Sequence, residues 1–183
     1  GMKKLRVGVV GVGHIGRNHA RLYAELSGVQ FTAIYDTDQA RAHQLADEFG
    51  IVAAPSLEEF AQEVDAASIA TPTSTHFDIA HELLTRGKHL LIEKPITATI
   101  EQARTLAKSN NPLVFFCFDA HLYPQTKKLL ELVQSESQTC SVVLLRDPYD
   151  RSFIKKDTPV TDAFGFRSVQ IQAALKHFSS KCV

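Results

Sequence analysis

Three glycines near the start of the chain have a spacing that could bind phosphate. Gly11, Gly13 and Gly16 form the pattern G-x-G-x-x-G between the β-branched run 5–10 and residues 15–26, where apolar side chains recur every three or four positions. A glycine loop between a buried strand and a helix lets main-chain N–H groups and the positive end of the helix approach a phosphate. The pattern therefore predicts a site for the diphosphate of a dinucleotide, and a glycine-rich turn without a ligand is the alternative.

Each residue of this loop has its own expected role. Gly11 permits the tight turn, Gly13 lets the main chain approach the diphosphate, and Gly16 lets the helix pack closely on the strand. His14 and Ile15 are expected beside the cofactor because they lie inside the loop. The ring of His14 is expected to point past the diphosphate, so we assign it no chemistry.

An acidic residue follows the second predicted strand. Asp36 lies twenty residues after Gly16, where a carboxylate accepts hydrogen bonds from the adenosine ribose and repels a 2′-phosphate. NAD is therefore the expected cofactor and NADP is less favoured, although Arg41 on the following helix could still bind a phosphate. The alternative role for Asp36 is that of a turn residue or helix cap, for which Asp38 is better placed.

Strands and helices alternate over the first two thirds of the chain. The expected strands are 5–10, 29–35, 51–53, 66–70, 89–92 and 113–118, and the expected helices are 15–26, 38–49, one from 57 capped by Ser56, 74–86 and 99–109. This alternation is typical of an α/β fold, a doubly wound parallel sheet with helices on both faces and right-handed crossovers. We therefore predict a dinucleotide-binding Rossmann domain over residues 1–119.

The alternation stops after residue 119. The remaining elements are a helix, a strand, an irregular stretch and a second helix, expected at 124–133, 140–145, 146–165 and 168–178. These are too few for a complete second domain, so residues 120–183 are predicted to be an incomplete C-terminal α+β segment. A lone strand at 140–145 would expose an unpaired edge. Either the tail covers that edge or a second copy pairs with it, which would produce a homo-oligomer.

Two further polar motifs fall at strand ends, which is where open parallel sheets bind ligands. Residues 70–76 read Ala-Thr-Pro-Thr-Ser-Thr-His after the fourth strand, and residues 87–95 end in Glu-Lys-Pro after the fifth. With the glycine loop and the Arg-Asn-His at 17–19, these stretches resemble the glucose-fructose oxidoreductase and inositol dehydrogenase family, Gfo/Idh/MocA. The resemblance runs from residue 5 to about 110 and more loosely to 146.

The resemblance implies roles for the residues of these motifs. Lys94 would lie by the nicotinamide and the substrate, where a lysine stabilises a developing oxyanion and influences proton movement; a solvated surface lysine is the alternative. Glu93 would orient Lys94, bind the cofactor or form a structural ion pair, and Pro95 would fix the turn. His19, on the apolar face of the first helix, is predicted to be a core histidine with satisfied hydrogen bonds. The other residues expected to flank the cofactor are Thr71, Pro72, Thr73 and His76.

One feature of the family has no counterpart in the sequence. The family's second domain carries an Asp-x-x-x-His motif whose histidine often serves as general acid/base, and residues 119–183 contain no such spacing, since Ala173 stands four places before His177. Residues 140–145 resemble the first strand of that domain's sheet, and the resemblance ends there. The chain is therefore expected to be a family member cut short.

Two classes of function follow from this pattern. The first is an NAD(P)-dependent oxidoreductase that moves hydride between nicotinamide and an alcohol or carbonyl of a sugar or polyol, with its acid/base group supplied by the tail or a partner chain. The alternative is a non-catalytic NAD(H)-binding module, such as a sensor, a regulator or a vestigial enzyme. Loss of a proton-transfer group removes about 10²–10⁴-fold in rate but leaves cofactor binding intact.

The composition limits the partners and the cellular compartment expected for either function. Twenty basic and twenty acidic residues cancel, so neither nucleic acid nor a membrane is an expected partner. The three cysteines, Cys117, Cys140 and Cys182, lie far apart, and the histidines form no cluster. No disulfide framework and no metal site are therefore expected, and a reducing cytoplasm fits.

Overall fold

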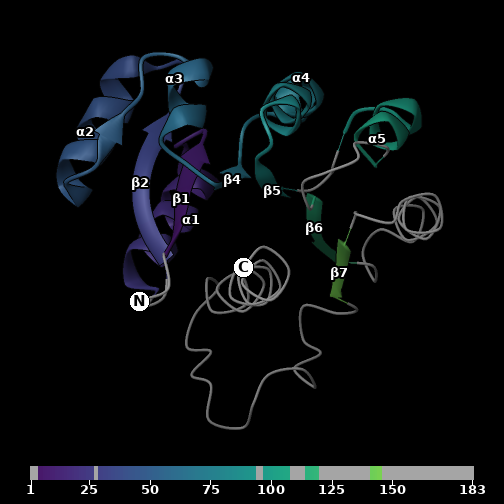
Figure 1. Ribbon diagram of the computed structural model, residues 1–183, viewed down its shortest axis with the longest axis horizontal. Helices are drawn as coiled ribbons and strands as arrows, with labels where there is room; N and C mark the ends of the chain where they lie inside the picture. Colours follow the sequence, from purple (N-terminus) through teal and green to yellow (C-terminus); the bar gives the residue numbers. More distant parts are fainter. Residues whose placement is uncertain (1–3, 27–28, 94–96, 108–113, 120–140, 146–183) are drawn as a thin grey trace, which may run out of the picture.

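A seven-stranded parallel sheet with helices on both faces forms the described part of the protein (Figure 1). The computed structural model describes residues 4–26, 29–93, 97–107, 114–119 and 141–145. The strands are β1 (Leu5–Val10), β2 (Val29–Tyr35), β3 (Val52–Ala53), β4 (Ala66–Ile69), β5 (His89–Ile92), β6 (Val114–Asp119) and β7 (Ser141–Leu145). The helices are α1 (His14–Glu25), α2 (Gln39–Phe49), α3 (Leu57–Gln62), α4 (Thr73–Thr85) and α5 (Ile100–Ala107).

The strand order places a switch point at the centre of the sheet. The order is β3-β2-β1-β4-β5-β6-β7, and each neighbouring pair is parallel. Chain direction across the sheet reverses between β1 and β4, so the connections on either side of this point leave in opposite directions. A crevice forms at the carboxyl ends of the strands at such a point, and ligands of doubly wound folds bind there.

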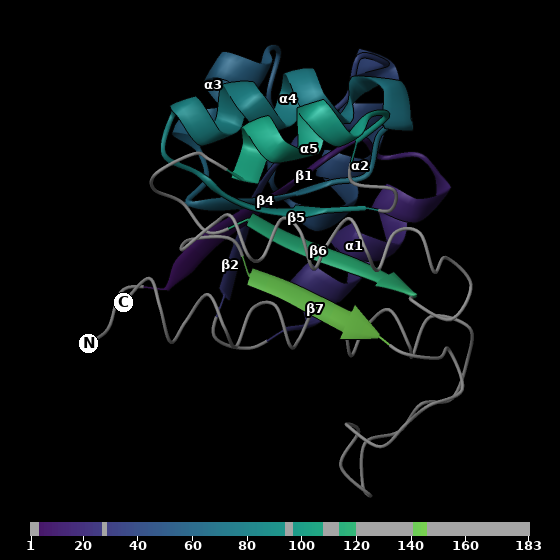
Figure 2. The ribbon, with the colours of Figure 1, turned by 90° about the vertical axis from the view of Figure 1, so that its right-hand side faces the viewer.

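Strand side chains alternate between two apolar cores, one on each face of the sheet. The core on the α1–α2 face includes Val7, Val9, Ala20, Tyr23, Ile34, Leu45 and Leu91. The core on the other face includes Val10, Phe60, Ile69, Leu83, Leu90, Ile92 and Leu106. Figure 2 shows the corresponding helices, α3, α4 and α5, together on one side of the sheet. Because both faces are covered, the central strands are apolar at nearly every position, as is usual for parallel sheets.

The predicted α/β fold is confirmed, and most element boundaries are correct within one or two residues. β1, β2 and β5 have the predicted limits, and the predicted strand at 113–118 is observed one residue later. The predicted caps are also present. The Asp38 side chain accepts a hydrogen bond from the Arg41 N–H at the start of α2, and Ser56 accepts one from the Glu59 N–H at the start of α3. The helices predicted at 124–133 and 168–178 lie outside the described residues.

The strand predicted at 140–145 is observed, but its partner differs from the expectation. Ser141–Leu145 pairs in parallel with β6 and forms the last strand of the sheet. The strand is therefore not alone, since its pairing with β6 continues the pattern of the Rossmann sheet. Its resemblance to the first strand of a second domain's sheet stays a prediction. The domain boundary after residue 119 stays a prediction, because β7 is the whole of the described structure beyond it.

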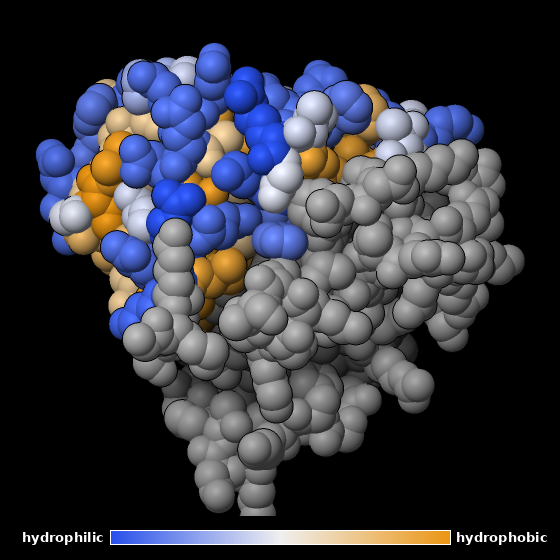
Figure 3. All heavy atoms as spheres, in the orientation of Figure 1, coloured by the Kyte–Doolittle hydropathy of each residue, from blue (hydrophilic) through white to orange (hydrophobic). Residues whose placement is uncertain are grey.

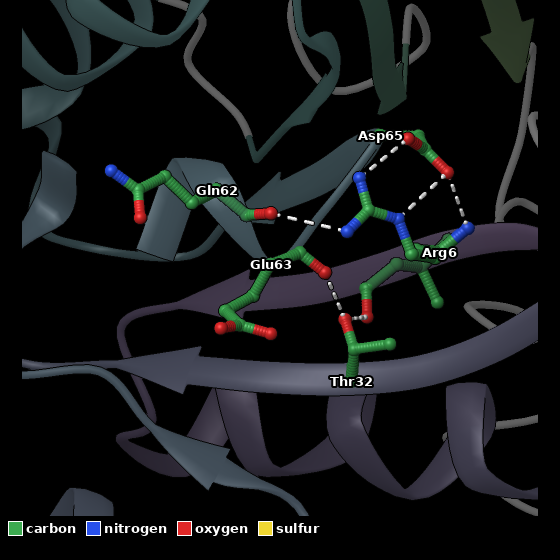
Figure 4. A network of polar contacts seen from close by, with 6 residues as sticks. Arg6, Thr32, Gln62, Glu63 and Asp65 are labelled. Carbon is green, nitrogen blue, oxygen red and sulfur yellow. Dashed lines mark hydrogen bonds and ion pairs between the residues drawn. The ribbon is translucent and has the colours of Figure 1, made fainter. Parts of the chain in front are cut away.

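The amino ends of the strands, opposite the crevice, are joined by polar contacts (Figure 4). Arg6 Nη2 donates to Asp65 Oδ1 at 3.0 Å, its main-chain N–H donates to Asp65 Oδ2 at 2.9 Å, and its Nη1 donates to the Gln62 carbonyl at 3.1 Å. The Thr32 hydroxyl contacts the Glu63 carbonyl at 2.6 Å. These contacts fix the chain leaving α3 against β1 and β2.

This end of the sheet should make stability depend on pH. Burial, with a smaller contribution from the Lys88 charge, lowers the pKa of His89 from 6.5, although the Asp65 carboxylate opposes the shift. The folded state therefore binds a proton on His89 less well than the unfolded chain does. The contribution of His89 to stability is complete above pH 6.5 and is lost as the pH falls through the lowered pKa of His89.

We expect His89→Gln to reduce this loss of stability. Urea unfolding of both proteins at about pH 7.5 and about pH 5 measures it. The loss between the two pH values should be smaller in the variant, by less than about 1 kcal/mol because His89 is only half-buried. An equal loss in both proteins would show that His89 does not carry the effect.

Candidate functional site

A cavity of about 460 Å³ opens at the carboxyl ends of β1, β2 and β4. Its walls come from the loop after β1, from the end of β2 with the start of α2, and from the end of β4 with the first turns of α4. The lining residues are Val10, Gly11, Gly13, Tyr35, Asp36, Thr37, Asp38, Arg41, Ala70, Thr71, Pro72, Thr75 and Ile79. The cavity therefore lies at the switch point of the sheet, where a ligand is expected.

Two of the three motif glycines are required by the fold itself. Gly11 has a φ of +87°, which disfavours any side chain, and a Cβ there would lie 2.7 Å from Thr71 Cγ2. A Cβ on Gly16 would lie 1.6 Å from the Gly11 carbonyl oxygen. The tight turn and the close helix–strand packing predicted for these residues are both observed.

Gly13 differs, because the described residues leave the space beside it largely open. Its φ of −69° is open to all residues, and the nearest atom to a Cβ built there is Arg41 Nη1 at 3.8 Å. Gly13 is also the N-cap of α1, with no side-chain cap and no acidic residue in the first turn. The positive end of helix α1 thus borders an open cradle, which fits a diphosphate.

Asp36 lies between this cradle and α2. Its Oδ2 accepts a hydrogen bond from the Val12 N–H at 2.8 Å, and its Oδ1 accepts one from the Asp38 N–H at 2.8 Å. Asp38, and not Asp36, caps α2, as the sequence predicts. Each carboxylate oxygen retains a second lone pair that could accept a ribose hydroxyl. Asp36 therefore lines the cavity with a fixed negative charge while holding the glycine loop.

The Thr-Pro-Thr stretch forms the opposite wall. Thr71 and Pro72 line the cavity, whereas Thr73 opens α4 and is not among the lining residues. The Thr75 hydroxyl donates to the Pro72 carbonyl at 2.7 Å and lies 2.8 Å from the Thr71 hydroxyl. The His76 ring is 1% exposed and its Nε2 donates to the Thr71 carbonyl at 2.8 Å, so His76 supports this wall from within the core.

Glu93 follows β5 directly at the neighbouring strand end. Its main-chain N–H donates to the Ile69 carbonyl at 2.9 Å, and its Oε1 lies 2.8 Å from His19 Nε2. The buried His19 also contacts the Ser68 hydroxyl through Nδ1 at 2.8 Å, so the prediction of a satisfied core histidine is confirmed. Lys94 and Pro95 lie outside the described residues.

The structure brings part of the predicted site into one cavity. Gly11, Gly13, Asp36, Thr71 and Pro72 line it, and the predicted residues that do not are His14, Ile15, Gly16, Thr73, His76 and Glu93. The lining residues absent from the predicted site are Val10, Tyr35, Thr37, Asp38, Arg41, Ala70, Thr75 and Ile79. Helical spacing could have found the last two, because Thr75 and Ile79 are four positions apart on the predicted helix that follows Thr71.

The described residues contain neither a metal-binding group nor a membrane-spanning helix. Within the described ranges, no three His, Cys, Asp or Glu side chains are grouped so as to hold a metal ion. No helix in the part of the chain that the structure covers has the length and apolar character needed to cross a membrane. On the face drawn in Figure 3, hydrophilic residues are spread over the described surface with smaller apolar areas among them.

Comparison with known proteins identifies relatives of the N-terminal part. The GFO_IDH_MocA family model, described as "Oxidoreductase family, NAD-binding Rossmann fold", matches residues 5–112. UDP-N-acetylglucosamine 3-dehydrogenase of Acidithiobacillus ferrooxidans is 47% identical over 105 residues, which cover 57% of this chain and 33% of that protein. Inositol 2-dehydrogenase of Rhizobium meliloti is 33% identical over 105 residues, which cover 57% and 32%. The chain thus spans about a third of the length of these curated relatives.

Solved structures show the same likeness. The structure of UDP-N-acetylglucosamine 3-dehydrogenase GnnA from Acidithiobacillus ferrooxidans matches with a TM-score of 0.59 and 38% identity, over 72% of this chain and 44% of that one. The structure of GenD2 from gentamicin A biosynthesis in complex with NAD matches with a TM-score of 0.61 and 25% identity, over 82% and 40%. Because the family model covers more than half of the chain, and the fold and the glycine loop agree with it, the protein belongs to the Gfo/Idh/MocA oxidoreductase family.

Proposed function

We propose that this chain binds NAD(H). The adenosine would occupy the cavity, with its ribose hydroxyls donating to Asp36, and the diphosphate would lie in the cradle beside Gly13. The observation that carries the proposal is this cradle, which opens at a helix N-terminus into the cavity that Asp36 lines. The nicotinamide would then extend toward the ends of β4 and β5, since the remainder of the cofactor must continue along the carboxyl edge of the sheet.

The proposed reaction is hydride transfer between nicotinamide and an alcohol or carbonyl of a sugar or polyol. Bound NAD(H) supplies the hydride acceptor or donor. The chain's own residues would bind the diphosphate, orient the adenosine ribose and hold the Glu-Lys-Pro turn at the end of β5. We assign Lys94 the role of stabilising negative charge on the reacting oxygen and influencing its proton, from the motif alone.

The substrate class follows the names of the relatives. One relative is named for UDP-N-acetylglucosamine and another for inositol, a sugar nucleotide and a cyclic polyol. A cytoplasmic location, and pairing of two copies through the strand at 140–145, are further parts of this proposal. They rest on the scattered cysteines and on β7 being the last strand in the sheet order.

NADH should bind more tightly than NADPH. The Asp36 carboxylate is held by two main-chain N–H groups, so it cannot swing away from a 2′-phosphate. We expect NADH to bind about tenfold or more tightly than NADPH, because the Asp36 carboxylate and the 2′-phosphate of NADPH are both negative and would lie close together. Titration by fluorescence measures it. Asp36→Asn should reduce the ratio of the NADH and NADPH affinities. Asp47→Asn makes an equal change of charge on the exposed face of α2 and should leave this ratio unchanged. Equal affinity of the unchanged protein for both nucleotides would overturn this role of Asp36.

Turnover distinguishes the enzyme from the binding module. The protein is incubated with NAD and a panel of sugars and polyols while absorbance of reduced nicotinamide is followed. If the chain is an enzyme, Lys94→Ala should lower the rate by about 10²-fold or more. Lys88→Ala, at the opposite end of β5, serves as the control and should keep the activity. Saturable NADH binding without turnover of any substrate would favour the non-catalytic module.

A further inference from the structure

A series of buried polar side chains connects α1 with the end of β5. His19 lies 2.8 Å from the Ser68 hydroxyl through Nδ1 and 2.8 Å from Glu93 Oε1 through Nε2. Tyr23, four residues after His19 on the same helix, contacts the Ser68 hydroxyl with its own. His19, Tyr23 and Ser68 are at most 2% exposed, and the Glu93 side chain is 15% exposed. The series therefore leads from the core to the strand end where the Glu-Lys-Pro motif begins.

The hydrogen bonds of this series have a direction. A carboxylate only accepts, so His19 Nε2 donates to Glu93, and this bond fixes the orientation of the ring. The Ser68 hydroxyl has one proton and two lone pairs, so it can bond His19 and Tyr23 at once. With Nδ1 as acceptor, Tyr23 donates to Ser68, Ser68 donates to His19 and His19 donates to Glu93. Each donor then points toward the carboxylate and stabilises its charge.

Stability is a weak reason for such a series to exist. Buried polar side chains must lose water, and apolar residues of similar size are often as stable in their place. The series gives the Glu93 carboxylate one defined position. The Glu93 main chain is fixed as well, because its N–H donates to the Ile69 carbonyl. Both the side chain and the main chain of Glu93 are thus held relative to β4.

We propose that His19 is a positioning residue for the nicotinamide half of the cofactor. Through Glu93 it would set the direction in which the chain enters Lys94 and Pro95. Helix α1 begins beside Gly13, so the same helix would locate the diphosphate with its first turn and Glu93 with His19. This inference rests on the proposed binding of NAD(H), and of the three roles predicted for Glu93 it favours the orientation of Lys94, with Glu93 held by the hydrogen bond from His19.

Two ligands and two variants of the full chain test the proposal. ADP-ribose carries the adenosine, the diphosphate and the second ribose of NADH but lacks the nicotinamide. His19→Asn keeps an amide near Ser68 but is too short to reach Glu93, whereas His19→Gln extends an amide nitrogen toward Glu93. Calorimetric titration should show that His19→Asn binds NADH about tenfold more weakly, the usual effect of losing a hydrogen bond to a charged group, with ADP-ribose unaffected. His19→Gln should bind both NADH and ADP-ribose with the affinity of the unchanged protein.

The outcomes separate this proposal from the proposed function. If the unchanged protein binds neither ligand, the binding of NAD(H) itself is wrong. If it binds both and His19→Asn weakens both equally, or weakens neither, the positioning role is wrong. His19→Gln behaving like His19→Asn would also overturn that role.

Variants of Glu93, which is more exposed than His19, give a second test. Glu93→Ala should weaken NADH alone, and adding His19→Asn should weaken it no further, because His19 acts through Glu93. Additive losses would contradict the proposal. If His19→Asn fails to fold in a thermal unfolding experiment, Glu93→Gln decides, since its carbonyl can still accept from His19. It should keep the NADH affinity that Glu93→Ala loses, and an equal loss in both would mean that the charge acts on the cofactor directly.

Discussion

Replacing Gly13 with valine is expected to abolish NADH binding while leaving the domain folded. The φ of −69° and ψ of −161° suit a β-branched residue, and the nearest atom to the new Cβ is 3.8 Å away. The valine would therefore find room in the free protein, but its methyl groups would fill the cradle at the start of α1. Because the diphosphate needs close contact with main-chain N–H groups there, its displacement should weaken NADH by about 10²-fold or more.

Fluorescence titration with NADH, together with thermal unfolding, measures both halves of this expectation. Ala24→Val is the control, since it adds the same two methyl carbons to an exposed position on the same helix. It should bind NADH as the unchanged protein does. An unchanged affinity in Gly13→Val would remove the basis for placing the diphosphate at this loop. A loss of folding in Gly13→Val would show that the cradle is occupied by the protein itself.

Replacing Gly16 with alanine is expected to have the opposite pattern, a large loss of stability. The added Cβ would lie 1.6 Å from the Gly11 carbonyl oxygen, which belongs to the main chain and cannot turn aside. Helix α1 would have to move away from β1, and this would disrupt the core that contains His19 and Tyr23. Overpacking of this severity should cost about 3 kcal/mol or more.

Urea unfolding measures the effect of Gly16→Ala as a shift of the midpoint relative to the unchanged protein. Ala24→Val again serves as the control, with a midpoint close to that of the unchanged protein. A Gly16→Ala variant as stable as its parent would mean that the first turn of α1 is not packed on Gly11. Two glycines of one motif should thus differ, with Gly13 needed for the ligand and Gly16 needed for the fold.

Local patterns account for the parts of the fold that the sequence predicted well. The apolar runs of β1, β2 and β5 are bounded by glycine or by charged residues, so their limits are correct. Ser56 and Asp38 could be recognised as caps because each precedes a helical pattern and its side chain bonds an N–H three residues later. The glycine loop could be placed because its strand and helix are both evident.

Contacts between distant segments account for what could not be predicted. The position of His19 on the apolar face of its helix predicted a buried ring. Its partners Ser68 and Glu93 could not be predicted, because they are 49 and 74 residues away in the sequence. Helical spacing places Ile79 on the same side of α4 as Thr75, but this side faces the cavity only because α4 packs beside β4. The partner of β7 depends in the same way on the arrangement of the whole sheet. The pairing of β7 with β6 was not predicted.

The double attachment of Asp36 has a consequence for redesign of the cofactor preference. A substitution such as Asp36→Ala, made to admit NADP, would leave the Val12 and Asp38 N–H groups without their acceptor. The loop that should receive the diphosphate would then be less well ordered. The substitution would admit the 2′-phosphate of NADP but would weaken binding of the diphosphate. An engineered NADP-dependent version would need a neutral side chain that still accepts both hydrogen bonds, with new positive charge supplied from α2.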